Sequence, residues 1–95
     1  MDTFEMDSKY IAGTYRRFPV EIVSGKGSIL NGCDGKNYID LGSGIGVNIF
    51  GIGDEKFKEA VIKQLDNVQH TSNLYYSAPC AGLAKELCER TGMKK

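Results

Sequence analysis

The sequence of 95 residues contains no tryptophan and has little proline, cysteine or histidine. It also lacks an excess of either charge, because twelve basic residues balance twelve acidic ones and the pI is about 6.6. A protein that binds nucleic-acid phosphates normally carries a basic stripe and has a pI above about 9. The charge balance therefore argues against nucleic acid as a partner.

The scarcity of cysteine and histidine excludes most metal and redox sites. Cys33, Cys80 and Cys88 form no C-x-x-C pair, and His70 is the only histidine. A zinc site needs a set of such ligands at defined spacing, which this chain does not offer. We predict reduced cysteines that are buried in a core, as is typical of free thiols.

Long hydrophobic runs are absent as well. The uncharged stretch from Leu41 to Gly53 is interrupted by glycines and is shorter than the roughly 20 apolar residues of a membrane-spanning helix. The first residues, MDTFEMDSKY, lack the basic start and the apolar block of a secretory signal. These absences predict a cytoplasmic protein that does not enter membranes.

The apolar residues that are present suffice for one modest core. They make up 41% of the chain, and a protein of this size buries only roughly 60 to 65% of its unfolded surface. We therefore expect residues 1–95 to form one segment without a second domain.

Two segments in the first seventy residues have the spacing of helices. The first dozen residues, with Asp2 or Thr3 as a possible cap, predict a short helix that ends before Gly13. Residues 54–69 predict a second helix, because their apolar side chains recur at helical intervals on one face. These side chains are Phe57, Val61, Leu65 and Val68.

The third helix has clear start and stop signals. Ser77 can cap it, Pro79 is tolerated in its first turn, and Gly92 is a typical residue for its end. Its apolar positions are expected to be buried. They are Leu83, Ala84, Leu87 and Cys88.

Strands are predicted between the first and second helices. Residues 20–23, 28–30 and 38–41 are rich in β-branched and aromatic side chains. The break at Ser24–Gly27 and the pair Asp34-Gly35 supply positions where the backbone adopts positive φ at little cost, which predicts two hairpin turns. A three-stranded antiparallel meander with flanking helices follows, and the fold class is α+β.

Two loops do not suit a self-contained domain. Residues 42–53 alternate glycines with large apolar side chains, and residues 70–77 combine hydrogen-bonding groups with adjacent tyrosines. Apolar loops of this length are usually functional or packed against another surface. We hypothesise that both loops face a partner or another part of a larger subunit.

No short catalytic motif is complete in this sequence. The glycines of residues 42–46 lack the spacing of a dinucleotide-binding fingerprint, and Ser43 lacks the G-x-S-x-G frame of a hydrolase nucleophile. Tyr15 stands next to Arg16 and Arg17, which could together position a carboxylate substrate. A solvated basic turn is an equally good interpretation of these three residues.

Five ordered blocks carry a more specific signal than these motifs. The blocks are Gly13–Val20, Gly25–Ser28, Asp34–Lys36 with Tyr38 and Asp40, Ser43–Asn48 and His70–Tyr76. In order and spacing they resemble the N-terminal part of the acetylornithine aminotransferases, a family of class III aminotransferases. The resemblance implies part of a fold type I enzyme, an α/β fold, with pyridoxal 5'-phosphate as the cofactor of the complete enzyme.

The resemblance also implies roles for two groups of residues. The group that matches the substrate side of the active site is Tyr15, Ser43, Gly44 and Ile45. The group that matches a loop at the dimer interface near an active site is Thr71, Ser72 and Asn73. Ornithine aminotransferases are similar to one another in carrying tyrosine at the position of Ile45, so the aliphatic residue favours the acetylornithine branch.

The implied activity belongs to a complete homodimeric enzyme. Such an enzyme moves the terminal amino group of N-acetylornithine to 2-oxoglutarate in arginine biosynthesis. The family's Schiff-base lysine and phosphate-binding segment match positions beyond Lys95, so we expect the chain to require the remainder of its subunit and to bind no cofactor alone. Alternatives are a class III enzyme for ornithine, 4-aminobutyrate or succinylornithine, and a non-catalytic interaction module.

Overall fold

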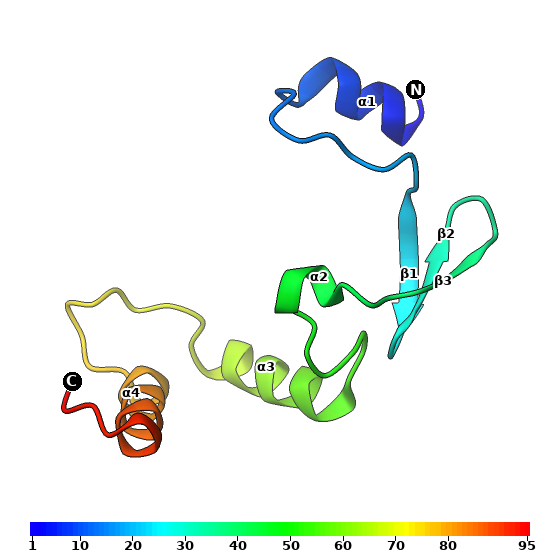
Figure 1. Cartoon of the computed structure of the whole chain (residues 1–95). Coiled ribbons are helices and arrows are strands. Elements are labelled where there is room, and N and C mark those ends of the chain that lie inside the picture. Colours follow the sequence, from blue (N-terminus) through cyan, green and yellow to red (C-terminus); the bar gives the residue numbers. More distant parts are fainter. The chain divides into compact units, whose positions relative to one another are not determined.

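The computed structural model describes all 95 residues. The chain divides into two compact units, Met1–Glu59 and Ala60–Lys95. A helix and three strands come first along the chain, and three further helices follow (Figure 1). None of the helices combines the length and the hydropathy that a membrane crossing requires.

Helix α1 (Thr3–Tyr10) begins at one of the two predicted caps. The Asp2 carboxylate accepts a hydrogen bond from the Glu5 backbone N–H at 2.8 Å, and the Glu5 carboxylate accepts one from the Asp2 N–H at 3.1 Å. This reciprocal capping box satisfies backbone donors that the start of a helix leaves free. The hydroxyl of Thr3 also donates to the Glu21 carboxylate at 2.8 Å, which links the helix start to the segment before the sheet.

The three strands form the predicted antiparallel meander. Strand β1 (Ile22–Lys26) pairs with β2 (Ile29–Gly32), which pairs in turn with β3 (Asn37–Ile39). The second hairpin turns at the predicted position, where Gly35 has a φ of 77° and the Gly32 N–H donates to the Lys36 carbonyl at 2.9 Å.

The first hairpin turns later than predicted. Strand β1 runs through Ser24 and Gly25, and the turn lies at Gly27, whose φ is 58°. A side chain at Gly25 would bring its Cβ within 2.8 Å of the Ile29 carbonyl oxygen, so this glycine allows close approach of two strands. Glycine therefore has a packing role here, and the interpretation of residues 24–27 as one turn is wrong.

The loop after β3 is tied back to the sheet. The N–H of Gly27 donates to the Ile52 carbonyl and the N–H of Ile52 donates to the Gly27 carbonyl, both at 2.8 Å. Gly51 lies so close to Gly27 that a Cβ on it would be 2.9 Å from the Gly27 Cα. The predicted long loop is thus anchored at its far end, and it contains the short element α2 (Ser43–Gly46).

Helices α3 (Glu55–Asn67) and α4 (Ala78–Thr91) lie where the sequence predicts them. The Asp54 carboxylate accepts from the Phe57 N–H at 2.8 Å and so caps the start of α3. Pro79 occupies the first turn of α4, and Gly92 ends it with a φ of 74°. Ser77 occupies the predicted N-cap position of α4, but its side chain makes no capping hydrogen bond.

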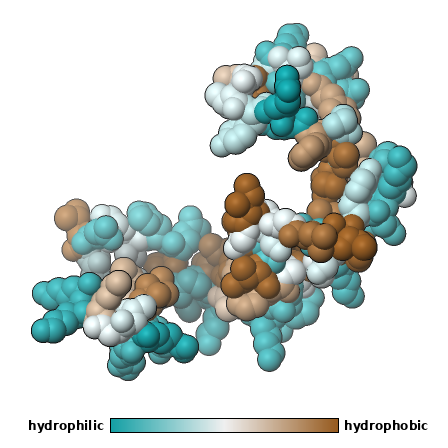
Figure 2. Space-filling model, viewed as in Figure 1, coloured by the Kyte–Doolittle hydropathy of each residue, from teal (hydrophilic) through white to brown (hydrophobic).

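The predicted core does not form within this chain. No hydrophobic side chain is buried, and Figure 2 shows hydrophobic residues at the surface. In the first unit the strands contact one another, but no helix packs on the sheet. The apolar face of α3 is exposed for the same reason, because no second layer covers it.

The predicted burial in α4 and at the cysteines is wrong as well. Leu83 and Leu87 are 62% and 55% exposed. All three cysteines are free, but Cys33 and Cys80 are exposed and Cys88 is half-buried. Helical spacing establishes which side chains share a face, whereas burial needs another surface that these units do not provide.

Candidate functional site

The element α2 is one turn of left-handed helix. Its four residues have positive φ values of 49° for Ser43, 61° for Gly44, 62° for Ile45 and 76° for Gly46. The two glycines adopt this conformation freely. Left-handed geometry costs an L-residue roughly 1–2 kcal/mol, and a β-branched residue such as isoleucine is a genuine outlier there.

The left-handed turn is held by hydrogen bonds at both ends. The Asp40 carboxylate oxygen Oδ1 accepts from the N–H groups of Gly42 at 3.0 Å and Ser43 at 2.8 Å. At the other end the Ser43 carbonyl accepts from Val47 at 2.9 Å and from Asn48 at 2.8 Å. Strain of this kind persists only where the surroundings fix it, and it concentrates at functional sites.

The side chains on this turn are available to a ligand or a partner. Ile45 is 98% exposed, so no side-chain packing within the chain compensates for its unfavourable backbone conformation. Ser43 is half-buried, and its side chain has no hydrogen-bond partner among the bonds of the turn. The turn therefore offers a hydroxyl group and an aliphatic group, but no charge.

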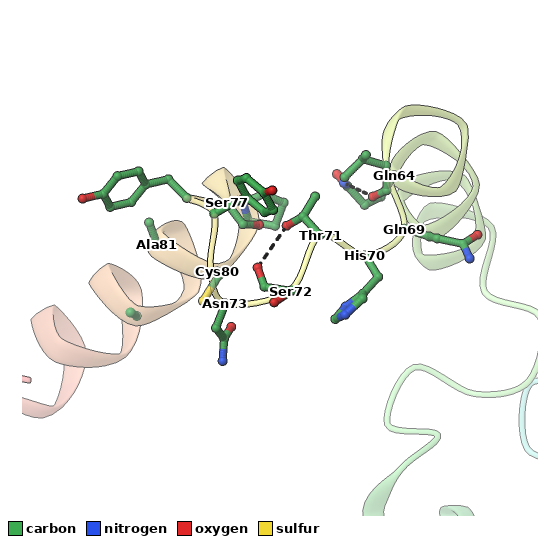
Figure 3. A pocket seen from close by; sticks show the side chains of 14 residues that line it. Gln64, Gln69, His70, Thr71, Ser72, Asn73, Ser77, Cys80 and Ala81 are labelled. Carbon is green, nitrogen blue, oxygen red and sulfur yellow. Dashed lines mark hydrogen bonds between the residues drawn. The ribbon is translucent and has the colours of Figure 1, made fainter.

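The second unit carries the other predicted loop, residues 70–77. It borders a cavity of about 620 Å³ between the ends of α3 and α4, seen from close by in Figure 3. The cavity has no charged residue in its lining. The lining residues are Gln64, Val68, Gln69, His70, Thr71, Ser72, Asn73, Tyr75, Tyr76, Ser77, Pro79, Cys80, Ala81 and Ala84.

The backbone of this loop turns sharply at Ser72, whose φ is 66°. The Ser72 hydroxyl accepts from the Leu74 N–H at 3.3 Å. The Thr71 hydroxyl donates to the Ser72 carbonyl at 3.4 Å, a bond drawn in Figure 3. These bonds are local, so the Asn73 amide and the exposed rings of Tyr75 and Tyr76 are left for contacts outside the loop. Neutral polar groups around an uncharged cavity are typical of a contact surface between proteins.

Tyr15 lies in the first unit, and its ring is 77% exposed. The guanidinium carbon of Arg17 is 6.0 Å from the ring centroid, at the limit of a cation–π contact. Arg17 is also paired with Asp7, with 3.4 Å between its Nε and the Asp7 Oδ1. Arg16 makes no ion pair, so it is the cation beside Tyr15 that is free to meet a carboxylate.

Asp34 and Tyr38 form a second polar cluster, which supports the hairpin. The Lys36 N–H donates to the Asp34 carboxylate at 3.0 Å and the Tyr38 hydroxyl donates to it at 2.9 Å. These bonds, the first above all, lower the pKa of Asp34, and the bond to Asp34 raises the pKa of Tyr38. The Asp34 and Tyr38 side chains bond to each other and to the backbone within the hairpin, so we interpret this cluster as structural.

The sequence-based reasoning missed the role of Asp40. This residue belongs to one of the resembling blocks, but no function follows from that block alone. An aspartate two residues before glycine is a signal for an Asx turn, in which the carboxylate accepts from backbone N–H groups further along the chain. That signal could have identified Asp40 as the residue that holds the left-handed turn.

No group of three or more His, Cys, Asp or Glu side chains could hold a metal ion. Every lysine is exposed, so none has the apolar enclosure in which a lysine amine becomes a nucleophile.

Comparison with known proteins establishes the family. The model of the class-III aminotransferase family matches residues 10–95. The chain belongs to the class III aminotransferases. Acetylornithine aminotransferase from Haemophilus ducreyi is 45% identical over 91 residues, which are 96% of this chain and 23% of that protein. The enzyme of the same name from Methanocaldococcus jannaschii is 43% identical over 91 residues. This class III aminotransferase chain thus spans about a quarter of the length of the relatives it matches.

Solved structures confirm the predicted fold. Acetylornithine aminotransferase from Elizabethkingia anophelis matches 94% of this chain with a TM-score of 0.83 and 25% identity, over 23% of its own length. Ornithine aminotransferase from Plasmodium yoelii matches 94% with a TM-score of 0.85 and 25% identity, over 24% of its length. The helices and the meander therefore form the N-terminal part of a fold type I class III aminotransferase. The fold alone does not distinguish an acetylornithine aminotransferase from an ornithine aminotransferase.

Class III aminotransferases use pyridoxal phosphate. The residues of this chain do not fit a covalent site for that cofactor, because every lysine is exposed.

Proposed function

We propose that this chain is the N-terminal segment of an acetylornithine aminotransferase subunit. The supporting observation is an identity of 40–45% to relatives of that name over most of the chain. The complete enzyme transfers the terminal amino group of N-acetylornithine to 2-oxoglutarate. The carbon that carried the amino group becomes an aldehyde, and the keto carbon of 2-oxoglutarate becomes the amino carbon of glutamate.

The exposed hydrophobic surface supports a role as one part of a subunit. The chain exposes 9000 Å², whereas a folded protein of its mass exposes about 5,400 Å². The excess is about 3,600 Å² on this chain alone, which is more than the roughly 1,000–2,500 Å² that each partner contributes to an obligate interface. We assign this surface to contacts with the remainder of the subunit and with a homodimer partner.

The left-handed turn and Tyr15 supply the substrate side of the site in this proposal. Ser43, Gly44 and Ile45 form an uncharged surface, which suits the neutral amide of N-acetylornithine better than the free ammonium group of ornithine. Tyr15, next to the unpaired Arg16, suits a substrate carboxylate. The cofactor and its lysine are then held by the remainder of the subunit.

The loop around the uncharged cavity supplies part of the dimer interface. Thr71, Ser72 and Asn73 present neutral hydrogen-bonding groups there. A contact made by such groups avoids the desolvation cost of buried charge. The proposal places this loop against the partner subunit, close to an active site.

The test is a hybrid enzyme, in which this chain replaces the matching quarter of the Haemophilus ducreyi acetylornithine aminotransferase. We expect transamination of N-acetylornithine with 2-oxoglutarate, and a higher kcat/KM for N-acetylornithine than for ornithine. The control is the remaining three quarters of that enzyme expressed alone, which should be inactive. A hybrid that prefers ornithine would support the sister activity, and a folded but inactive hybrid would support a non-catalytic interaction module.

A further inference from the structure

Asp40 joins the sheet to the left-handed turn. Its own backbone N–H donates to the Ser28 carbonyl at 2.8 Å, so the end of β3 fixes where its side chain starts. Its carboxylate then accepts from Gly42 at 3.0 Å and from Ser43 at 2.8 Å. One carboxylate oxygen thus holds two successive N–H groups at the entry to the turn.

The turn has few other means of support. Ile45 is held at a φ of 62° although its side chain is exposed, so no side-chain packing on this chain stabilises that geometry. The remaining bonds are backbone bonds that span the turn itself. Ile45 and Gly46 donate to the Gly42 carbonyl, and Val47 and Asn48 donate to the Ser43 carbonyl. These bonds join residues of the turn to one another, whereas Asp40 links the turn to the sheet.

We propose that Asp40 is a positioning residue, which keeps residues 43–46 left-handed and thereby fixes the Ser43 hydroxyl and the Ile45 side chain toward the amino donor. This inference rests on the proposed function for the identity of the donor. The two hydrogen bonds by which Asp40 holds Gly42 and Ser43, here called the clamp, rest on the geometry of the turn alone.

The kinetic test uses the hybrid enzyme with Asp40→Ala and Asp40→Asn. Loss of two hydrogen bonds to a carboxylate should raise the KM for N-acetylornithine about tenfold, with a smaller change in kcat. Asparagine keeps an oxygen at the Oδ1 position and should hold the KM within about threefold of the unmodified value. Asp34→Ala is the matched control, because it removes a carboxylate that accepts a backbone N–H elsewhere in the same sheet.

A double-mutant cycle with Ile45→Gly separates positioning from general destabilisation. Glycine adopts positive φ without strain, so the turn should need Asp40 less when residue 45 is glycine. We expect Asp40→Ala to change the discrimination between N-acetylornithine and ornithine when Ile45 is present and to have little effect on it in the Ile45→Gly background. Equal effects in both backgrounds, or an Asp40→Ala enzyme that behaves like the Asp34→Ala enzyme, would overturn the proposal.

A spectroscopic measurement on the 95-residue chain makes the clamp testable without activity. A residue with positive φ has a strong nuclear Overhauser effect between its own Hα and its amide proton. Labelled Ile45 should show this signal in the unmodified chain and in Asp40→Asn, and should lose it in Asp40→Ala. If Asp40→Ala keeps the signal, the clamp is refuted, whereas an inactive hybrid would count against the proposed function alone.

Discussion

Urea should unfold the isolated chain along a shallow transition, because little surface is buried in its folded form. The slope of the unfolding free energy with urea concentration, the m-value, increases with the area that unfolding exposes. The chain has no buried hydrophobic side chain, so unfolding exposes less new surface than it does in most proteins of this size. The same reasoning predicts that contact with the rest of a subunit buries the hydrophobic surface that the isolated chain leaves exposed.

The structure gives the size of the effect. An unfolded chain of this mass exposes about 15,000 Å², and an ordinary folded protein of this mass about 5,400 Å². The folded chain exposes 9000 Å². Folding therefore buries only about three fifths of the usual area, and the m-value should be about three fifths of the value for a typical protein of this length.

The assay is a urea titration followed by far-ultraviolet circular dichroism and by tyrosine fluorescence, since the chain has no tryptophan. Hydrogen exchange on the same samples should show weak protection of the amides of α3 in the isolated chain. In the hybrid enzyme the same amides should be strongly protected, because another surface covers the face of α3 that contains Phe57, Val61 and Leu65.

A substitution on α3 connects this prediction to particular side chains. Leu65→Asp should leave the helix content of the isolated chain almost unchanged, since Leu65 is 55% exposed there, and should prevent assembly of the hybrid. Lys63→Asp, on the polar face, is the control and should permit assembly. If the isolated chain is monomeric and unfolds cooperatively with an ordinary m-value, the hydrophobic side chains pack within it and the reasoning is wrong.

Three further predictions concern local features. Gly92→Ala should weaken the end of α4 by about 1 kcal/mol because its φ is 74°. Gly82→Ala inside the same helix should increase the helix content and make the ellipticity at 222 nm more negative. The pKa of Asp34 is lowered from its ordinary value of 3.8, so its support of the hairpin is present above that pH and is lost on acidification through the lower value; hairpin chemical shifts should report an acid transition that is absent in Asp34→Asn. The pKa of the Cys33 thiol is raised by desolvation and by the Glu21 carboxylate, so Glu21→Gln should speed alkylation of Cys33 by iodoacetamide at pH 8.

Sequence patterns predicted the elements well where local chemistry decides the structure. The capping box at Asp2 and the limits of α4 at Pro79 and Gly92 depend only on neighbouring backbone groups. The turn at Asp34-Gly35 is of the same kind, because glycine supplies positive φ and aspartate accepts from the backbone. Such features can be identified without knowledge of the tertiary structure.

The errors arose where the structure does not follow the local preference of a residue. The local pattern favours a turn at Gly25, but this residue is small because the backbone of Ile29 passes close to it. The left-handed conformation of Ile45 was missed as well, because isoleucine disfavours it, and only the spacing of Asp40 and Gly42 signals a turn at this place. The predicted site residues Ser43, Gly44 and Ile45 lie together on that turn, and their roles stay predictions.

The left-handed turn makes the handedness of a single amino acid an experimental variable. A D-residue has the mirror-image preference in φ, so D-allo-isoleucine at position 45, which differs from L-isoleucine at Cα alone, would lie in its own favoured region, where L-isoleucine is strained. The change inverts one stereocentre and keeps every atom type, the hydropathy and the charge. Cys33 and Cys88 divide the chain into pieces short enough for peptide synthesis, and their thiols allow the pieces to be joined by ligation. The backbone strain at this turn can therefore be removed by stereochemistry alone.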